Sequence, residues 1–252
     1  MNTRERSSLH IATSGWYYDH WRGPLYPPGL PKSAFLKFYS ERFSTVEINN
    51  SFYRLPEEKT LKMWREAVPP GFIFSVKASR LITHNKKLKD PETTLPRFFE
   101  RITALGEGLG PVLFQLPPAW RLNKERLKTF LDALSPGFRY AFEFRDPSWF
   151  DEGVFELLRE KNAAFCVYEF DRILSPKEVT ADFAYVRLHG PGGKYRGSYD
   201  DEALKGWATT LKAWLKQGAA EVFCYFDNDE AGYAALNAMR LNEILGLRKY
   251  NR

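Results

Sequence analysis

Three side chains suited to proton transfer, Glu47, Glu143 and His189, stand in or at the ends of short apolar runs far apart in the sequence. Carboxylates and imidazoles whose pKa values are shifted by their surroundings perform general acid and base catalysis near neutral pH. Similar runs also carry three cations, which bind or stabilise negative charge in such sites: Lys77, Arg145 and Arg187. If one fold gathers these side chains, they predict acid/base chemistry on a small anionic compound, phosphorylated or sugar-like, of the kind that hydrolases and isomerases perform.

The elements that must position these side chains are eight short apolar runs. In six of them polar residues alternate with apolar ones: Glu47 lies between Val46 and Ile48, and Arg187 between Val186 and Leu188. Alternate residues of a strand point to opposite faces, so one face packs on helices and the other gathers the ionisable groups. The predicted strands are His10–Ser14, Ser44–Asn49, Phe72–Lys77, Pro111–Gln115, Tyr140–Arg145, Ala164–Glu169, Phe183–His189 and Glu221–Phe226.

Helix-like stretches separate these runs, which predicts an α/β fold with a parallel sheet. Eight such units in 252 residues match the roughly 250 residues of a (β/α)8 TIM-type barrel. The segment Asp171–Asp182 is too short and too weakly patterned for a crossover helix, so helix six is predicted to be a single turn or missing. A doubly wound open sheet is the alternative. We expect one domain over residues 1–252, with 1–8 and 247–252 as loose tails. The predicted helices are Ser33–Phe43, Glu57–Ala67, Leu95–Leu105, Lys124–Leu134, Glu152–Lys161, Asp201–Lys216 and Glu230–Leu245.

Active sites of such barrels lie at the carboxyl ends of the strands, where these polar residues fall. Glu47, Glu143 and His189 are the catalytic candidates. The structural alternative is that the charges only pair with one another inside the barrel, Glu47 with Arg187 and Glu143 with Lys77 or Arg145. Similarly, the loop tryptophans either stack on a ligand or are buried under the loops. The predicted substrate-binding residues are Asn49, Lys77, Arg80, Gln115, Arg145, Arg187, Tyr225, Trp16 and Trp149.

The composition narrows the partners and the compartment. A net charge of +6 favours a small anionic ligand or phosphate and allows weak, nonspecific nucleic-acid binding. With four histidines and no metal-binding motif no cofactor is expected, although Glu47, Glu143 and His189 would suit a single Mg²⁺ or Mn²⁺ ion. Cys166 and Cys224 fall inside apolar runs, as buried cysteines of a reducing compartment do. No signal region or membrane-spanning run is seen, so we expect a cytoplasmic protein with no membrane partner.

Seven segments with a distinctive composition are spread over nearly the whole chain: TSGWYYDHWRGPLYP (13–27), VEINNSFYRLP (46–56), FSVKASRLITH (74–84), LGPVLFQLPP (109–118), AFEFRDPSWF (141–150), YVRLHGP (185–191) and YFDND (225–229). In this order they resemble the signature segments of the YecE-like family, also known as domain of unknown function 72. The resemblance implies a TIM-type barrel but no established reaction. The last segment differs from the YFNND-like form of the family at position 227, so the resemblance assigns no role to Asp227.

Three classes of function therefore remain open. The first is an acid/base enzyme with its site at the barrel mouth. The second is a nucleic-acid-binding or phosphoester-cleaving, nuclease-like barrel, in which aromatic and basic rim residues contact the strand. The third is a non-catalytic ligand-binding barrel. At the last strand–helix junction, Asp229 is expected to cap the following helix.

Overall fold

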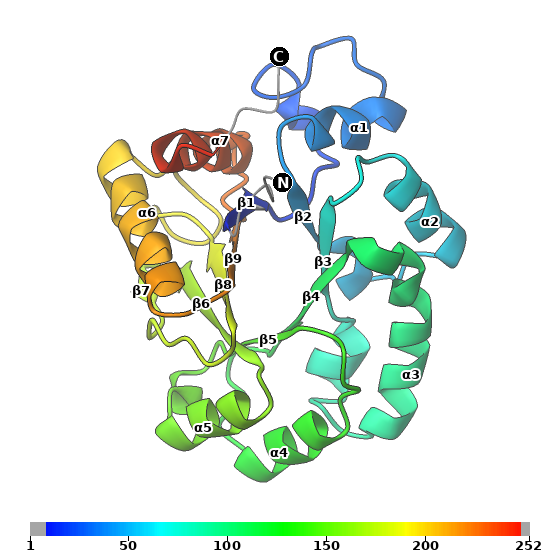
Figure 1. Cartoon of the computed structure of the whole chain (residues 1–252), viewed down its shortest axis with the longest axis vertical. Helices are drawn as coiled ribbons and strands as arrows, with labels where there is room; N and C mark the ends of the chain where they lie inside the picture. The colour runs from blue at the N-terminus through cyan, green and yellow to red at the C-terminus, as the bar shows by residue number, and fades with distance from the viewer. Residues whose placement is uncertain (1–8, 248–252) are drawn as a thin grey trace, which may run out of the picture.

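Eight parallel strands form the wall of a barrel, and helices surround it (Figure 1). The computed structural model describes residues 9–247; the predicted tails, apart from Leu247, lie outside this range. The strands follow the order β2, β3, β4, β5, β6, β8, β9, β1 around the wall, and the predicted (β/α)8 TIM-type fold is confirmed. The strands are β1 (Leu9–Thr13), β2 (Thr45–Ile48), β3 (Ile73–Lys77), β4 (Leu109–Gln115), β5 (Tyr140–Glu143), β6 (Ala164–Phe170), β8 (Phe183–Leu188) and β9 (Glu221–Phe226).

The helices follow the strands in the predicted order, with shifts of a few residues at their ends. Three begin where an aspartate or asparagine side chain accepts a backbone N–H of the first turn, as Asn123, Asp151 and Asp200 do. None of the helices between residues 9 and 247 has the length and apolar character to cross a bilayer. The helices are α1 (Phe35–Ser40), α2 (Glu58–Glu66), α3 (Pro91–Ile102), α4 (Lys124–Asp132), α5 (Glu152–Glu160), α6 (Asp201–Lys216) and α7 (Tyr233–Leu245).

Helix six is missing, as predicted. After β6 the chain turns back through Asp171 and Arg172, both with positive φ (54° and 65°), and forms the short antiparallel strand β7 (Ile173–Leu174). The rest of this connection runs to β8 without a helix.

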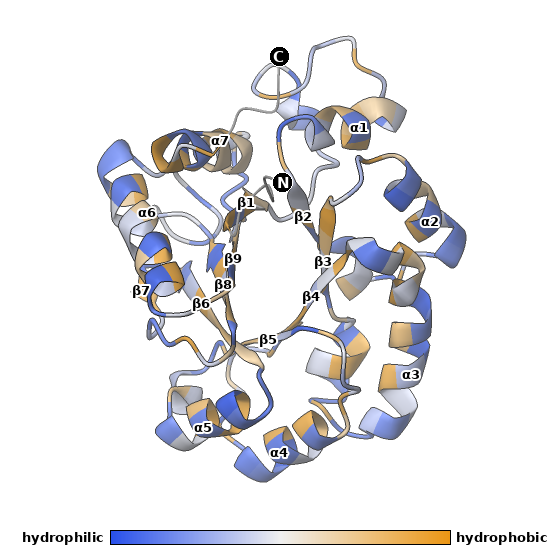
Figure 2. Ribbon diagram, viewed as in Figure 1, coloured by the Kyte–Doolittle hydropathy of each residue, from blue (hydrophilic) through white to orange (hydrophobic). Residues whose placement is uncertain are grey.

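Each strand divides its side chains between two environments, as the alternation predicts. In the outer layer the rings of Phe114 and Phe142 stack with their centres 5.2 Å apart. Phe130 of α4 packs edge-on against Phe114, with a ring-centre distance of 5.0 Å. Figure 2 shows strands that are largely apolar and helices with polar outward sides. Inside the barrel, the Tyr225 hydroxyl lies 2.7 Å from both Thr45 Oγ1 and Ser75 Oγ. The polar interior therefore continues down from the mouth into the barrel.

The barrel closes between β1 and β2 through a single bridge at Ser14 and Glu47, where the Gly15 amide donates to the Glu47 carbonyl at 2.8 Å. Below this point the Thr13 amide donates to the Tyr39 hydroxyl of α1, at 3.2 Å, rather than to β2. A side chain from a surrounding helix thus replaces a ladder bond at this seam, and the seam lies beside the predicted catalytic residues.

Candidate active site at the mouth of the barrel

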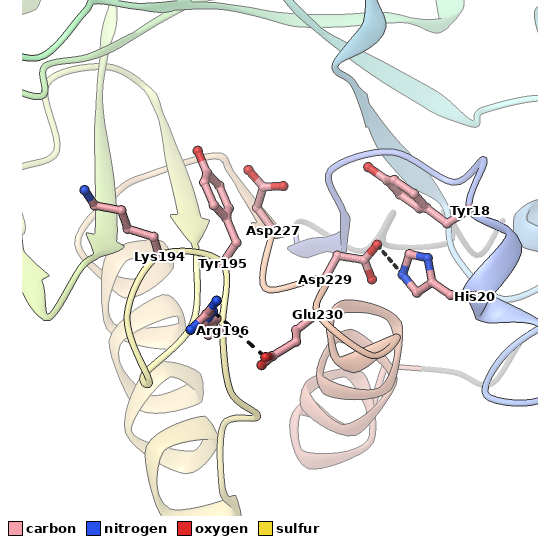
Figure 3. Close-up of a pocket in the computed structure, with 8 residues that line it drawn as sticks. All are labelled: Tyr18, His20, Lys194, Tyr195, Arg196, Asp227, Asp229 and Glu230. Atoms are coloured by element: carbon pink, nitrogen blue, oxygen red, sulfur yellow. Dashed lines mark ion pairs between the residues drawn. The ribbon is translucent and has the colours of Figure 1, made fainter.

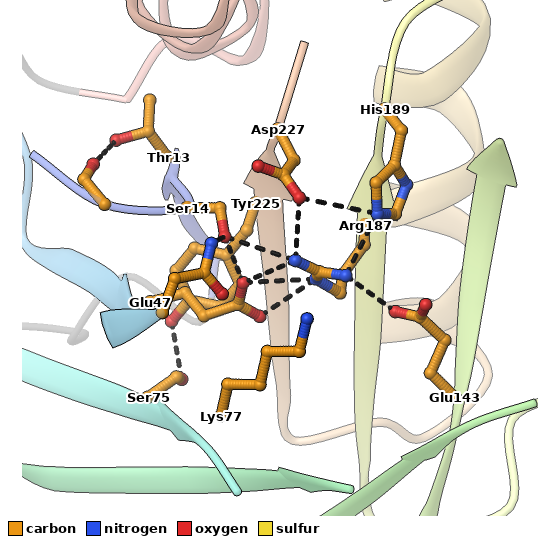
Figure 4. A network of polar contacts seen from close by, with 12 residues as sticks. Thr13, Ser14, Glu47, Ser75, Lys77, Glu143, Arg187, His189, Tyr225 and Asp227 are labelled. Carbon is orange, nitrogen blue, oxygen red and sulfur yellow. Dashed lines mark hydrogen bonds and ion pairs between the residues drawn. The ribbon is translucent and has the colours of Figure 1, made fainter. Parts of the chain in front are cut away.

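Arg187, near the end of β8, lies at the centre of a buried charged cluster (Figure 4). Its Nη2 and Nε approach the Glu47 carboxylate at 2.9 and 3.1 Å, and Nη1 donates to Glu143 Oε2 at 2.9 Å. Nη2 also donates to Ser14 Oγ at 3.2 Å and to Asp227 Oδ2 at 2.9 Å. Because the guanidinium is almost completely buried, these partners replace all of its water.

Glu47 and Glu143, from opposite walls of the barrel, are both fully buried. Glu47 also accepts hydrogen bonds from Ser14 Oγ and, at 2.7 Å, from the Tyr185 hydroxyl. Glu143 receives a second guanidinium, because Arg145 Nε donates to its Oε1. Burial acts to raise the pKa of Glu143, but Arg145 and Arg187 outweigh it and hold that pKa well below its usual range. Glu143 is therefore a permanent anion at neutral pH.

His189 is held as a neutral imidazole. Its Nδ1 lies 3.1 Å from the Glu169 carbonyl, which can only accept, so Nδ1 carries the proton. Nε2 then accepts N–H groups from Arg187 and Arg145, both at 2.9 Å. Burial and these two guanidinium groups lower the pKa of His189 far below its ordinary value. With both nitrogens engaged, His189 orients the two arginines.

Asp227, which follows β9, completes the cluster from the solvent side. Its carboxylate binds Arg187 and lies 3.6 Å from His189 Nε2, and 15% of its side chain is exposed. Burial raises the pKa of Asp227 to about 6; Arg187 acts against this shift and Glu47 adds to it. Its carboxyl faces outward, and a pKa of about 6 places its change of protonation close to neutral pH.

Lys77, at the end of β3, points its ammonium toward Arg187 (Figure 4). Within residues 9–247 the ammonium makes no hydrogen bond or ion pair, and Nζ lies 4.6 Å from the centre of the Phe52 ring. Burial and the charge of Arg187 lower its pKa to about 8, although Glu143, Asp227 and Glu47 oppose the shift. Among the residues that the structure describes, the cluster thus contains three carboxylates and three cations, and the Lys77 cation makes no ion pair with them.

A pocket of about 430 Å³ opens beside Asp227, between the loops that follow β1, β8 and β9 (Figure 3). The β8 loop folds back so closely that a Cβ on Gly190 (φ +106°) would lie 2.2 Å from the Arg196 carbonyl, so only glycine fits there. The pocket volume lies within the range of small-molecule sites, about 300–1,000 Å³. The residues that line it are Tyr18, His20, Lys194, Tyr195, Arg196, Asp227, Asp229 and Glu230.

The prediction that Asp229 caps the last helix is wrong: Gly232 precedes α7, and no side chain caps it. The Asp229 carboxylate turns instead to the β1 loop, where Oδ1 accepts Trp21 Nε1 at 2.5 Å and Oδ2 lies 2.8 Å from His20 Nε2. Asp229 therefore joins the loop after β9 to the loop after β1, and both loops line the pocket.

Most of the predicted polar site residues share this end of the barrel. Asn49 donates to Ser14 Oγ, and Tyr225 lies below Glu47 in the interior. Gln115 turns away, donating to the Leu116 carbonyl at 2.7 Å. Arg80 is exposed on the loop after β3, close enough to His84 to lower that group's pKa, after burial and Lys77.

Trp16 and Trp149 lie outside both the cluster and the pocket lining. Trp149 is fully buried, stacks on Phe144 at 4.8 Å and donates to the Trp120 carbonyl at 2.6 Å. Trp16 is 6% exposed and meets the edge of Trp64 at 4.9 Å. Their contacts are those of tryptophans buried under the loops, the alternative given above for these residues.

The family model described as "Protein of unknown function DUF72" matches residues 10–252. The chain belongs to the DUF72 family. It is 26% identical over 272 aligned residues to the UPF0759 protein YunF of Bacillus subtilis, covering 95% of each chain. It is 31% identical over 119 residues to the UPF0759 protein YecE of Escherichia coli K12, covering 47% of this chain and 44% of that protein.

Solved DUF72 structures share the whole fold. A DUF72 protein from Thermotoga maritima superposes with a TM-score of 0.85 at 30% identity, covering 94% of this chain and 99% of the other. One from Enterococcus faecalis superposes with a TM-score of 0.83 at 20% identity, covering 95% and 96%. The family description carries no reaction, so the chemistry of this DUF72 chain must be argued from its own site.

The single Mg²⁺ or Mn²⁺ ion stays a prediction. Between residues 9 and 247 no three His, Cys, Asp or Glu side chains are grouped as metal ligands. In this DUF72 chain the guanidinium of Arg187 lies between Glu47 and Glu143, where the ion was expected. Those two carboxylates already have a cation between them.

Sequence reasoning missed Asp227, Ser14 and Tyr185 in this DUF72 site. The alternation contains a signal for two of them: Asp227 has the parity of Tyr225, and Tyr185 that of Arg187. Ser14 ends the first predicted strand, and its role depends on the barrel closing there.

Proposed function

We propose that this protein is an enzyme of general acid/base chemistry, acting on a small, sugar-like compound with an anionic group in the mouth of the barrel. Asp227 carries the proposal: its carboxyl is bound to Arg187, lines a 430 Å³ pocket and has a pKa of about 6. A carboxyl with such a pKa donates and accepts protons at neutral pH. An isomerase would use this chemistry to move a proton at the carbon next to a carbonyl group. A hydrolase would use it to give a proton to the leaving group.

The other charged residues support Asp227 rather than share its role. Glu47 and Glu143, the catalytic candidates predicted from the sequence, are fully buried and hold Arg187 between them. Arg187 in turn holds Asp227 and stabilises its anion. We therefore assign proton transfer to Asp227, and to Glu47, Glu143 and His189 the positioning of Arg187.

The pocket favours a hydroxylated substrate. Tyrosine hydroxyls, carboxylates and His20 line it, which together donate and accept the hydrogen bonds that sugar hydroxyls make. Lys194 lies 3.5 Å from Asp171, and Arg196 lies 4.0 Å from Glu230, so both cations of the pocket wall have partners. Lys77, whose ammonium makes no ion pair among the described residues, is the cation of the mouth left to contact the substrate.

Hydrogen–deuterium exchange into candidate substrates tests the proposal without knowledge of the product. The protein is incubated in D₂O with dihydroxyacetone phosphate, ribose 5-phosphate or glucose 6-phosphate, and deuterium at carbon is followed by mass spectrometry. We expect exchange in at least one probe, reduced at least about 100-fold in Asp227→Asn, the typical contribution of one general acid or base.

The matched control is Glu230→Gln, which removes a carboxylate from the same pocket wall but not from the cluster. Exchange that persists in Asp227→Asn would refute the assigned role of Asp227. Saturable binding of a probe with no exchange or turnover would make the protein the non-catalytic ligand-binding barrel.

Three exposed tyrosines favour a nucleic-acid-binding role as the second candidate. Tyr17, Tyr53 and Tyr195 are 59%, 81% and 46% exposed, on the loops after β1, β2 and β8. Exposed aromatic rings at a positively charged surface stack on single-stranded bases. Titration with short single- and double-stranded oligonucleotides at physiological salt separates the candidates: saturable binding lost in Tyr53→Ala supports this role, whereas weak, salt-sensitive binding supports the small-molecule enzyme.

A further inference from the structure

Lys77 differs from the other cations of the cluster in having no partner. Arg187 and Arg145 donate to carboxylates and to His189, but the Lys77 ammonium makes no hydrogen bond or ion pair within residues 9–247. Lys77 is the last residue of β3 and is partly exposed, and its side chain points into the mouth of the barrel (Figure 4). Its Nζ lies 4.6 Å from the centre of the Phe52 ring.

Charged groups face Lys77 from several elements of the barrel. Glu47 of β2, Glu143 of β5 and Asp227 after β9 stabilise its cation, while Arg187 of β8 repels it. His84, on the loop after β3, is also coupled to it and is kept neutral, because burial, Lys77 and Arg80 lower its pKa to about 4. The cation at this nitrogen offsets carboxylate charge in the cluster, but within residues 9–247 it makes no ion pair with any of the three carboxylates.

We propose that Lys77 is a nucleophile that captures the carbonyl group of an aldehyde or keto-acid substrate as an imine. The inference rests on the proposed function and deepens it, because it names a carbonyl compound as the substrate class of the same mouth. An amine that forms no hydrogen bond has its lone pair available once it loses a proton.

The reaction balances with groups already present. The neutral amine attacks the carbonyl carbon, its nitrogen gives one proton to the nearby Asp227 carboxylate, and Asp227 passes that proton to the carbonyl oxygen, which gives a neutral carbinolamine. A second proton on that oxygen lets water leave and gives an iminium. Amine, carbonyl compound and one proton thus become iminium and water, with no oxidation or reduction.

The cluster suits this product. An iminium carries the same positive charge as the ammonium, so Glu47, Glu143 and Asp227 remain balanced when the carbonyl compound is bound. Because the pKa of Lys77 is lowered to about 8, a reactive fraction of neutral amine exists near neutral pH. Lys194 provides the contrast in the same mouth: it is 63% exposed and lies 3.5 Å from Asp171.

Borohydride trapping tests the imine. The native protein is treated with glyoxylate or glyceraldehyde, reduced with sodium borohydride, and digested, and each lysine is quantified by peptide mass spectrometry. At pH 8 about half of Lys77 is neutral, compared with about 1% or less of an exposed lysine. We expect Lys77 to be labelled at least about tenfold faster than Lys194 and Lys62, with a midpoint near pH 8.

Lys77→Arg keeps the charge but cannot form an imine, so the fast labelling should disappear while the melting temperature stays close to that of the wild type. Labelling of Lys77 no faster than of Lys194 in the wild type would overturn the proposal, and this comparison needs no variant. If Lys77 is not trapped but Asp227-dependent deuterium exchange is seen, the imine fails and the acid/base proposal stands. If Lys77 is trapped without such exchange, the acid/base proposal fails.

Discussion

Strand β9 carries a carboxylate at each end, and their surroundings shift the two pKa values in opposite directions. Glu221 begins the strand, 2.9 Å from His10 and paired with Arg139, and its side chain is 34% exposed. The hydrogen bond from His10 and the charge of Arg139 lower its pKa despite partial burial. Asp227 follows the strand, and burial beside Glu47 raises its pKa to about 6 although it binds Arg187.

The difference in pKa shift follows from the different surroundings of carboxylates at the two ends of the barrel. At the amino end, the Glu221 carboxylate is partly exposed, and its contacts with His10 and Arg139 stabilise its charged form. At the carboxyl end, three carboxylates bind Arg187, and burial disfavours the ionised form of one of them, Asp227. A raised carboxyl pKa at the carboxyl end of a barrel supports the role proposed for Asp227.

The largest expected effect is that of Glu143→Gln. This change leaves Arg145 and Arg187 without the anion that both contact, and breaking a buried pair costs about 3–5 kcal/mol. If Glu143 had been the proton-transfer group, the same change would leave the fold nearly intact. Thermal and urea unfolding at pH 7 decides between the two, and a loss below about 1 kcal/mol would show that the cluster tolerates the missing charge.

Asp227→Asn should have a smaller effect, of opposite sign. The folded-state pKa of about 6 exceeds the usual 3.8, so the folded protein binds more protons than the unfolded chain between these pH values. The wild type therefore loses stability as pH rises from about 4 to about 6, and above pH 6 carries the full cost, about 1–3 kcal/mol. The variant should be more stable than the wild type by that amount at pH 8 and equal to it near pH 4. A variant less stable than the wild type at pH 8 would show that Asp227 is a structural ion pair.

Glu221→Gln is the matched control at the other end and should have the smallest effect, under about 1 kcal/mol, because its pair is partly exposed. Its lowered pKa stabilises the fold above the unfolded value, and this contribution is lost as pH falls through the folded value. Unfolding of both proteins with and without about 1 M salt checks this: the difference should shrink in salt. A loss as large as that of Glu143→Gln would remove the contrast between the two ends.

Alternation along the strands was enough to predict which residues face the barrel interior. Glu47, Lys77, Glu143, Arg187 and His189 were expected at one mouth from parity alone, and the structure places them there. This succeeds because a strand has only two faces and one of them must be apolar to pack against helices.

Roles inside the mouth could not be predicted in the same way. Whether Glu143 or Asp227 changes its protonation depends on how many guanidinium groups contact each carboxylate, which is set by strand neighbours and side-chain reach. Burial of the loop residues could not be predicted from the strand pattern either. Trp149 follows a strand as a rim residue would, but a loop that folds back buries it, and no periodicity records that fold.

At the seam between β1 and β2, the residue that closes the barrel is also part of the charged cluster. Within residues 9–247 one backbone bridge joins these strands, and Glu47 supplies both the carbonyl of that bridge and the carboxylate that binds Arg187. Glu47 therefore takes part both in closing the ring of strands and in binding Arg187 at the centre of the charged cluster. Separating β1 from β2 at this seam would break the Gly15–Glu47 bridge and, because Glu47 also binds Arg187, would disturb the charged cluster as well.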